Sequence, residues 1–172
     1  LDVQPAAPGI RDAGDDQGRE RWLRLLTWAP GRMYAQVKPQ SDALRYSLGK
    51  SLAHLCSGLQ HFEHPAAFRQ MKWDLAQLEQ VAEKSHTVSL PERRAILEDF
   101  LNLHREQVAP LLPDIRRSVI YNDANDYNIL VGGEPGNYRV TGFIDFGDAV
   151  YTHTINELAI AIAYAIFDQP NP

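Results

Sequence analysis

The stretch VIYNDANDYNILV, residues 119–131, sets an unusual polar cluster between two apolar runs. The runs VIY and ILV are typical of β-strands. The residues between them carry two carboxylates and three carboxamides. After the second run, GGEPGN (132–137) is a strong turn signal, and GFIDFGDA (142–149) follows it. The order strand, polar loop, strand, turn, strand predicts a β-hairpin whose far strand returns to the polar loop.

This hairpin is expected to bring three side chains together: Asp123, Asn128 and Asp145. Oxygen ligands suit Mg²⁺, which usually takes one or two protein ligands beside substrate phosphates. A remaining carboxylate can accept the proton of an attacking hydroxyl. Protein kinases divide this labour between an Asp, an Asn five residues later and the Asp of a D-F-G sequence. The same spacings occur here, in the same order, and they indicate phosphoryl transfer.

Two other interpretations of the loop remain. Asn, Asp and Gly are common in turns, so either motif alone fits a plain polar turn. A calcium loop starting at Asp123 would place Asn125 at its third position and Glu134 at its twelfth. That loop needs Gly at position six, where Asn128 stands, and helices on both sides, where strands are expected.

The remainder of the chain is predicted to be mostly helical. Leucines at spacings of three and four predict a helix over 41–62, with Ser41 at its start. Pro91 and Pro110 bracket a second long helix at about 91–109. The other expected elements are strands at 21–28, 119–121, 129–131 and 138–146, a short helix after HPAAFRQMKWDL, and a final helix at 155–167.

Composition narrows the classes of partner. The 172 residues carry a formal charge of −5, which argues against nucleic acid as a partner. The longest apolar stretch, Leu158–Phe167, is too short to cross a membrane, so no membrane partner is expected. A single cysteine, Cys56, excludes an intrachain disulfide and fits a cytoplasmic location.

The segment YNDANDYNILV…VTGFIDFGDAVYTHTINELAIAIAY resembles the aminoglycoside phosphotransferase and choline kinase-like family. It is most similar to the hydroxylysine kinase-like branch, which includes kinase domains fused to class III aminotransferases. The resemblance covers about residues 21–168 and is tightest over 118–166. It implies a protein kinase-like fold, with ATP as phosphoryl donor and Mg²⁺ as cofactor.

The resemblance also implies roles for individual residues. Asp123 would be the catalytic base, Asn128 and Asp145 would bind Mg²⁺, and Asp148 would support the site. Tyr121 stands where the family usually has His, a residue that mainly holds the scaffold by a hydrogen bond. Asn122 stands where the family often has Gly. These two departures leave the proposed chemistry in place.

The same resemblance also implies which residues would contact the nucleotide and which would contact the acceptor substrate. Leu26, Thr27 and Trp28 would lie at the hinge strand beside the adenine pocket. Trp73 and Glu157 would face the substrate, with Asp74 beside Trp73. A packing role for Trp73 is the alternative, as is a dipole-stabilised acid in the first turn of a helix for Glu157.

We therefore expect an α+β, mainly helical C-terminal lobe of a protein kinase-like fold, with a small β-hairpin carrying the active-site loop. Residues 1–29 would be a loop and the last strand of an N-lobe that is otherwise lacking. Residues 30–172 would be the helical lobe, with its catalytic loop at 118–148 and its last helices missing. No glycine-rich phosphate loop or Val-Ala-x-Lys strand precedes residue 21, so the sequence is expected to be an inactive fragment of a longer chain.

The expected function of the complete protein is ATP-dependent phosphorylation of a hydroxyl on an amine-bearing substrate. Aminoglycosides, hydroxylysine and amino alcohols are all compatible. The alternative is a non-catalytic kinase-like module in a multidomain fusion protein. An aminotransferase is the expected fusion partner.

Overall fold

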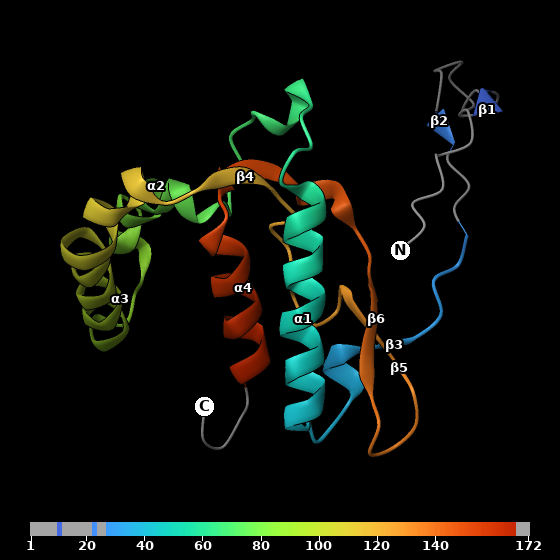
Figure 1. The fold of residues 1–172 in the computed structure, drawn as a ribbon. Coiled ribbons are helices and arrows are strands. Elements are labelled where there is room, and N and C mark those ends of the chain that lie inside the picture. The colour runs from blue at the N-terminus through green and yellow to red at the C-terminus, as the bar shows by residue number, and fades with distance from the viewer. Residues whose placement is uncertain (1–9, 12–21, 24–26, 168–172) are drawn as a thin grey trace, which may run out of the picture. The chain divides into compact units, whose positions relative to one another are not determined.

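A computed structural model describes residues 10–11, 22–23 and 27–167 (Figure 1). The chain divides into two compact units, Leu1–Pro30 and Gly31–Pro172. In the first unit, the short strands β1 (Ile10–Arg11) and β2 (Trp22–Leu23) pair antiparallel. Only Trp22 and Leu23 of the strand expected at 21–28 are described as a strand. The roles expected for residues 1–29 and 30–172 remain predictions.

The longest helix of the described residues is α1 (Asp42–Leu59), as the leucine spacing predicts. It begins where the Ser41 hydroxyl accepts a hydrogen bond from the Leu44 N–H at 3.2 Å. Leu44, Leu48 and Leu52 form its buried face. This face packs into the core together with residues of the hairpin and of the last helix.

The predicted hairpin is confirmed. Strands β5 (Ile129–Gly132) and β6 (Arg139–Phe143) pair antiparallel, with Ile129 opposite Phe143. The turn closes where the Asn137 N–H donates to the Glu134 carbonyl at 2.8 Å. Gly133 is required here, since its φ is +102° and a Cβ would lie 2.4 Å from the Asn137 carbonyl oxygen.

Two more strand pairings were not predicted. Strand β3 (Arg32–Met33) adds to the free edge of β5 and gives the order β3-β5-β6. Strand β4 (Arg117–Ile120) pairs antiparallel with β7 (Val150–His153), so the two strands form a separate small sheet. The polar loop thus leaves one sheet and enters another.

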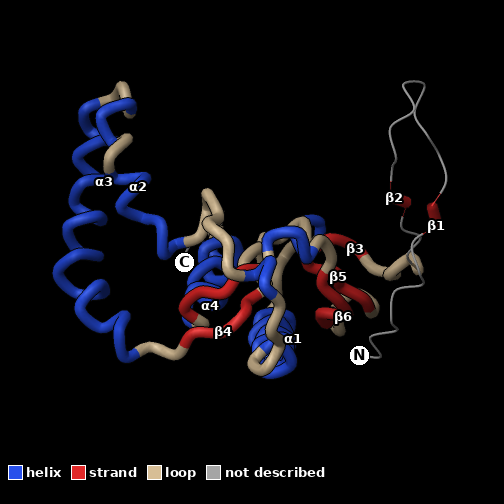
Figure 2. Tube along the Cα trace, turned by 90° about the horizontal axis from the view of Figure 1, so that it is seen from above, coloured by secondary structure: helices blue, strands red, loops and turns tan. Residues whose placement is uncertain are grey.

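Helix α4 (Ile155–Ile166) follows β7 directly and confirms the final helix. Within residues 31–167, α1 lies between the β3-β5-β6 sheet and α4 (Figure 1). The second long predicted helix is α3 (Pro91–Leu103), which continues into a π-helical turn over His104–Val108. Together with α2 (Leu78–Ala82), it lies on the side away from the β3-β5-β6 sheet (Figure 2).

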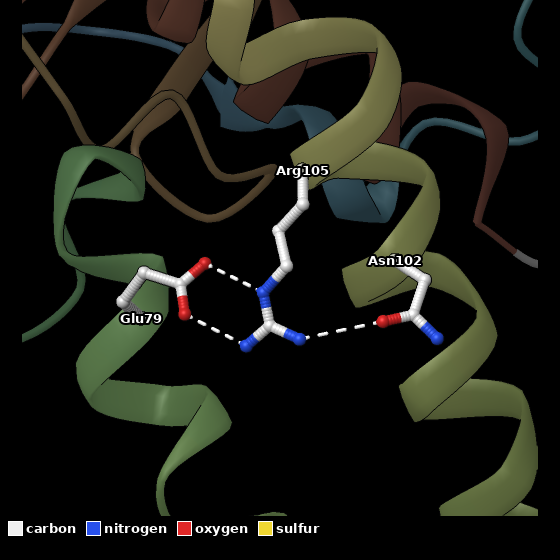
Figure 3. A network of polar contacts seen from close by, with 3 residues as sticks. All are labelled: Glu79, Asn102 and Arg105. Carbon is white, nitrogen blue, oxygen red and sulfur yellow. Dashed lines mark hydrogen bonds and ion pairs between the residues drawn. The ribbon is translucent and has the colours of Figure 1, made fainter.

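An exposed polar network joins α2 to the end of α3 (Figure 3). Arg105 donates to both carboxylate oxygens of Glu79, from Nε at 3.0 Å and from Nη2 at 2.7 Å. Its Nη1 donates to the Asn102 amide oxygen at 3.3 Å. The ion pair lowers the pKa of Glu79, but solvent and salt screen such surface pairs.

The architecture of the described residues is α+β, with small antiparallel sheets among helices, and this is the class that the sequence predicts. No helix among these residues is long and apolar enough to cross a membrane. Seven short helical turns, six 3-10 and one π, complete this part of the chain.

Candidate active site

The polar loop between β4 and β5 is held by Asn125. Its amide oxygen accepts hydrogen bonds from the N–H groups of Tyr127 and Asn128, at 2.9 and 3.2 Å. Its amide nitrogen donates to Asp123 Oδ1 at 2.8 Å. A side chain that bonds its own following backbone fixes a turn without regular structure. Asn125 therefore shapes the loop, a role that the sequence analysis did not assign to it.

Asp123 and Asn128 are in direct contact. Asn128 Nδ2 donates to Asp123 Oδ2 at 2.6 Å and also lies 3.3 Å from the Asp123 carbonyl oxygen. The carboxylate therefore has one amide donor on each oxygen, Asn125 on Oδ1 and Asn128 on Oδ2. Such donors fix the orientation of a carboxylate. The strands on both sides of the loop are unlike the helix–loop–helix frame of an EF-hand.

Asp145 follows β6, at the point where the hairpin returns to the loop. The Ile144 N–H donates to the Asn128 carbonyl at 3.0 Å, which places Asp145 next to that segment. Asp145 has φ +58°, in the left-handed region, and its Oδ1 accepts from the Gly147 N–H at 3.2 Å. Its charge also opposes ionisation of Asp123. The hairpin thus brings the Asp145 turn and the Asp123–Asn128 pair to the same end of the sheet.

Tyr121 links the two segments through the interior. It is fully buried, and its hydroxyl donates a hydrogen bond to the Ile144 carbonyl, one residue before Asp145. Its ring lies 4.8 Å from that of Phe146, between ring centroids. Burial raises the pKa of the phenol well above its ordinary value, so the hydroxyl remains a donor. Tyr121 thus provides a scaffold hydrogen bond at this position.

Replacing Tyr121 by Phe should lower the free energy of unfolding by about 0.5–1.5 kcal/mol, because a part-buried hydrogen bond to the Ile144 carbonyl is lost while the ring is kept. Urea unfolding measures the change. Tyr46→Phe is the matched control, because Tyr46 is exposed on α1 and its substitution should cost little. Equal losses in both variants would contradict the structural role of the Tyr121 hydroxyl.

The environment of Asp123 raises the pKa of its carboxyl. Burial is the main cause, and the charges of Asp148 and Asp145 add to it. Hydrogen bonds from Asn125 and Asn128 partly offset the rise. A raised pKa makes a carboxylate a better proton acceptor as long as it stays ionised at the working pH.

The segment from His64 to Asp74 supports the turn after Asp145. Arg69 donates to the Gly147 carbonyl and, at 3.2 Å, to the Ala149 carbonyl. Trp73 Nε1 donates to Asp148 Oδ2 at 2.6 Å. The sequence analysis singled out Trp73 and Asp148 separately and missed Arg69, because its partners are backbone atoms almost eighty residues away.

Asp74 is a buried anchor of the fold. Its Oδ1 accepts from Thr152 Oγ1 at 2.9 Å and from the Ala76 N–H at 3.0 Å, and it lies 3.5 Å from Asn156 Nδ2. Asp74 thereby ties its own short helix to β7 and to α4. No substrate role is needed to explain this carboxylate.

Glu157 holds the loop from the side of α4. Its side chain is only 1% exposed, and Oε2 accepts from the Asn122 backbone N–H at 2.9 Å. Burial raises the pKa of Glu157, and hydrogen bonds from the backbone at 122 and 121 oppose the rise. This contact fits the alternative of a structural acid in the first turn of a helix. Contact of Glu157 with a substrate remains a prediction.

The raised pKa makes Glu157 a source of pH dependence. As the pH rises from the ordinary value of 4.5, the unfolded chain loses this proton before the folded chain does. The folded state then binds more protons, so stability falls with rising pH. Glu157→Gln does not titrate and should gain stability relative to wild type as the pH rises from 4.5 to neutrality. Urea unfolding in EDTA tests this, and a relative stability that falls over that range would contradict it.

An open pocket of about 450 Å³ lies beside Asp123. Its other lining residues come from the 61–77 segment, the loop, the turn after Asp145 and α4: Trp73, Asn122, Asp148, Ile160 and Tyr164. Asn128, Asp145 and Glu157 are not among them. The pocket therefore combines two carboxylates, an unpaired amide and aromatic rings.

The hinge predicted at residues 26–28 falls in the first unit of the chain and partly outside the described residues. Leu26 lies outside the described residues, and Trp28 is 89% exposed. Thr27 and Trp28 belong to the first unit of the chain. Adenine contact by these residues remains a prediction.

The site offers side-chain oxygen atoms of the kind that bind Mg²⁺. The amide nitrogen of Asn128 donates to Asp123, which leaves its amide oxygen for another partner. Mg²⁺ binds oxygen ligands of this kind. Asp145 would supply a carboxylate from the neighbouring segment. The part of the chain that the structure describes has no cluster of three or more His, Cys, Asp or Glu side chains placed for a metal. Two protein ligands completed by phosphates and water match the usual habit of Mg²⁺.

The motifs of this loop predict a phosphotransferase, and the comparison with known families agrees. The whole chain, residues 1–172, matches the phosphotransferase enzyme family, and the chain belongs to that family. It is 32% identical to hydroxylysine kinase of Mus musculus over 160 residues, which cover 87% of this chain and 42% of that protein. Hydroxylysine kinase of Xenopus laevis is 33% identical over 161 residues, covering 87% and 43%.

A longer match is to hydroxylysine kinase of Bos taurus, at 29% identity over 188 residues, covering 98% of this chain and 50% of that protein. The chain thus spans about half the length, or less, of the curated relatives it matches. The family indicated by the sequence motifs is confirmed, and so is the similarity to hydroxylysine kinases.

Proposed function

We propose that the protein transfers the γ-phosphoryl group of ATP to a hydroxyl of a small amine-bearing alcohol. The observation that carries this proposal is the hydrogen-bonded pair of Asp123 and Asn128, with the Asp145 turn beside it. Membership of the phosphotransferase family supports it. The names of the relatives suggest hydroxylysine as the first acceptor to test.

Asp123 has the role of the general base. Its carboxylate accepts the proton of the acceptor hydroxyl as the oxygen attacks phosphorus. The amide donors from Asn125 and Asn128 hold this carboxylate in one orientation, which contributes to catalysis by positioning. Asn128 and Asp145 would hold Mg²⁺, whose charge would stabilise the phosphates during transfer.

The acidic pocket has the role of the acceptor site. Asp123 and Asp148 give it negative charge, and Trp73 and Tyr164 give it aromatic surface. Both features favour a cationic ligand. Trp73 is fixed by its bond to Asp148, so it supports the turn and lines the pocket at once.

The test is a panel of acceptors given to the full-length protein with Mg²⁺ and ATP. We expect ADP release and a phosphomonoester signal in ³¹P NMR with 5-hydroxy-L-lysine, ethanolamine, homoserine or kanamycin. L-lysine, which lacks the hydroxyl, is the matched control. Nucleotide binding without turnover on any acceptor would favour the alternative of a non-catalytic kinase-like module.

We also propose that the 172 residues alone do not sustain turnover, because phosphoryl transfer depends almost entirely on positioning and on charge around the phosphates. The matched residues cover only 42% and 43% of two hydroxylysine kinases, and this is consistent with the proposal. A cytoplasmic location, where ATP is available, and fusion to an aminotransferase are further proposals drawn from the sequence.

A further inference from the structure

We propose that Asn122 selects the acceptor by binding an ammonium group on the carbon next to the reacting hydroxyl. This rests on the proposed function and makes the preferred acceptor a vicinal amino alcohol. The Asn122 side chain is only 2% exposed, yet among the described residues neither its amide oxygen nor its amide nitrogen has a hydrogen-bond partner. It lines the pocket beside Asp123. Buried amides are normally paired, so the Asn122 amide has hydrogen-bonding capacity for a ligand group.

The backbone at this position does not explain the side chain. Asn122 has φ +65°, in the left-handed region. Glycine adopts that conformation without steric cost and would bury no unpaired amide. The Asn122 N–H is held by Glu157, so the residue is fixed whatever its side chain. The carboxamide is therefore not needed for the turn.

The chemistry of the pocket indicates what the carboxamide binds. The lining carries the carboxylates of Asp123 and Asp148 and the rings of Trp73 and Tyr164. No lining residue is cationic, and the nearest cation to these rings that the structure records is Lys72, whose Nζ lies 5.9 Å from the centroid of the Trp73 ring. Carboxylates and aromatic faces favour an ammonium group. The Asn122 amide oxygen would accept one of its N–H donors.

Chain order gives the spacing. Asn122 directly precedes Asp123, the proposed base, and both line the same pocket. A ligand whose hydroxyl reaches Asp123 can therefore present the neighbouring carbon to Asn122. In 5-hydroxylysine and in ethanolamine, that carbon carries the ammonium group. In homoserine the two groups are farther apart.

The test compares two acceptors on the full-length protein. 5-Hydroxy-L-lysine carries the terminal ammonium, and 5-hydroxy-L-norleucine has the same hydroxyl without it. Asn122→Gly should lower kcat/KM for hydroxylysine by about 10–100-fold, as expected for loss of a charge-assisted hydrogen bond, and should change the value for hydroxynorleucine by less than about threefold. The KM for ATP should not change. Asn137→Gly, in the exposed hairpin turn, is the matched control.

A second variant separates binding from folding. Asn122→Asp keeps a residue that tolerates the left-handed backbone and keeps an acceptor oxygen. It should retain the preference for hydroxylysine over hydroxynorleucine that Asn122→Gly loses. Thermal unfolding of Asn122→Gly should stay close to wild type, whereas Asn122→Asp should unfold more easily, because it buries a carboxylate beside Asp123 and Glu157.

Three results would overturn the inference. If wild type phosphorylates hydroxylysine and Asn122→Gly keeps the preference, the role of Asn122 is wrong and the proposed function stands. A loss of the preference in Asn122→Asp as well as in Asn122→Gly, with lowered thermal stability in Asn122→Gly, would show a structural role instead. If wild type phosphorylates no acceptor, the proposed function fails and the inference fails with it.

Discussion

Asp123→Asn in the full-length protein should lower kcat by about 10²–10⁴-fold, the usual contribution of a general base. Binding of Mg²⁺–ATP should change little, because Asp123 is assigned to the acceptor hydroxyl and not to the metal. Steady-state rates with hydroxylysine and calorimetric titration of Mg²⁺–ATP measure the two quantities separately.

The structure adds a consequence for stability. Asn125 and Asn128 each donate to a different oxygen of Asp123, and a carboxamide offers only one oxygen. One of these bonds must be lost in Asp123→Asn, so unfolding should also become easier by roughly 1 kcal/mol. Asp126→Asn, in the same loop, is the matched control and should keep kcat within about threefold of wild type. Lost nucleotide binding with an unchanged kcat in Asp123→Asn would reverse the assigned roles.

The hairpin and the polar loop could be predicted because their signals are local. Apolar runs, a turn rich in glycine and the spacing of Asp123, Asn128 and Asp145 all lie within about thirty residues. A hairpin with that turn has few ways to pair, so it fixes which side chains meet. The two long helices could also be predicted, because leucine spacing marks one of them and flanking prolines mark the other.

Contacts between distant segments could not be predicted from local pattern. Arg69 reaches the carbonyls of Gly147 and Ala149, and nothing in its own neighbourhood indicates this. Strand β7 was missed because its four residues lie between the Asp145 motif and the apolar final helix, which both give stronger signals. Its partner, β4, is separated from it in the sequence by the whole β5–β6 hairpin. Pairing at that distance depends on how the intervening chain packs.

The roles of Asn122 and Asn125 illustrate a different limit. Both are Asn residues in a loop that is rich in Asn. No local signal in the sequence shows that their side chains have different roles. In the structure Asn125 satisfies three partners, whereas the amide of Asn122 has none among the described residues. Only the three-dimensional arrangement separates a residue that shapes the loop from one available to a ligand.

Asp145→Asn should weaken nucleotide binding and turnover together. The substitution is nearly isosteric, because Asn tolerates the left-handed backbone at φ +58° and can still accept from the Gly147 N–H. The turn should therefore survive, and the main loss is the negative charge assigned to Mg²⁺. Loss of even an outer-shell partner of a metal typically costs about 10–100-fold in affinity or activity, so a direct ligand should cost at least as much.

Raised Mg²⁺ should partly restore both the affinity for ATP and kcat in this variant, because mass action refills a weakened metal site. Asp148→Asn is the matched control three residues along the same turn. It keeps an oxygen for the Trp73 Nε1 donor and should leave the Mg²⁺ dependence as in wild type. Calorimetry of ATP binding over a series of Mg²⁺ concentrations distinguishes the variants. Should Asp148→Asn show the stronger Mg²⁺ dependence, the metal would belong with Asp148, on the pocket side of the turn, and Asp145 would have only the structural bond to Gly147.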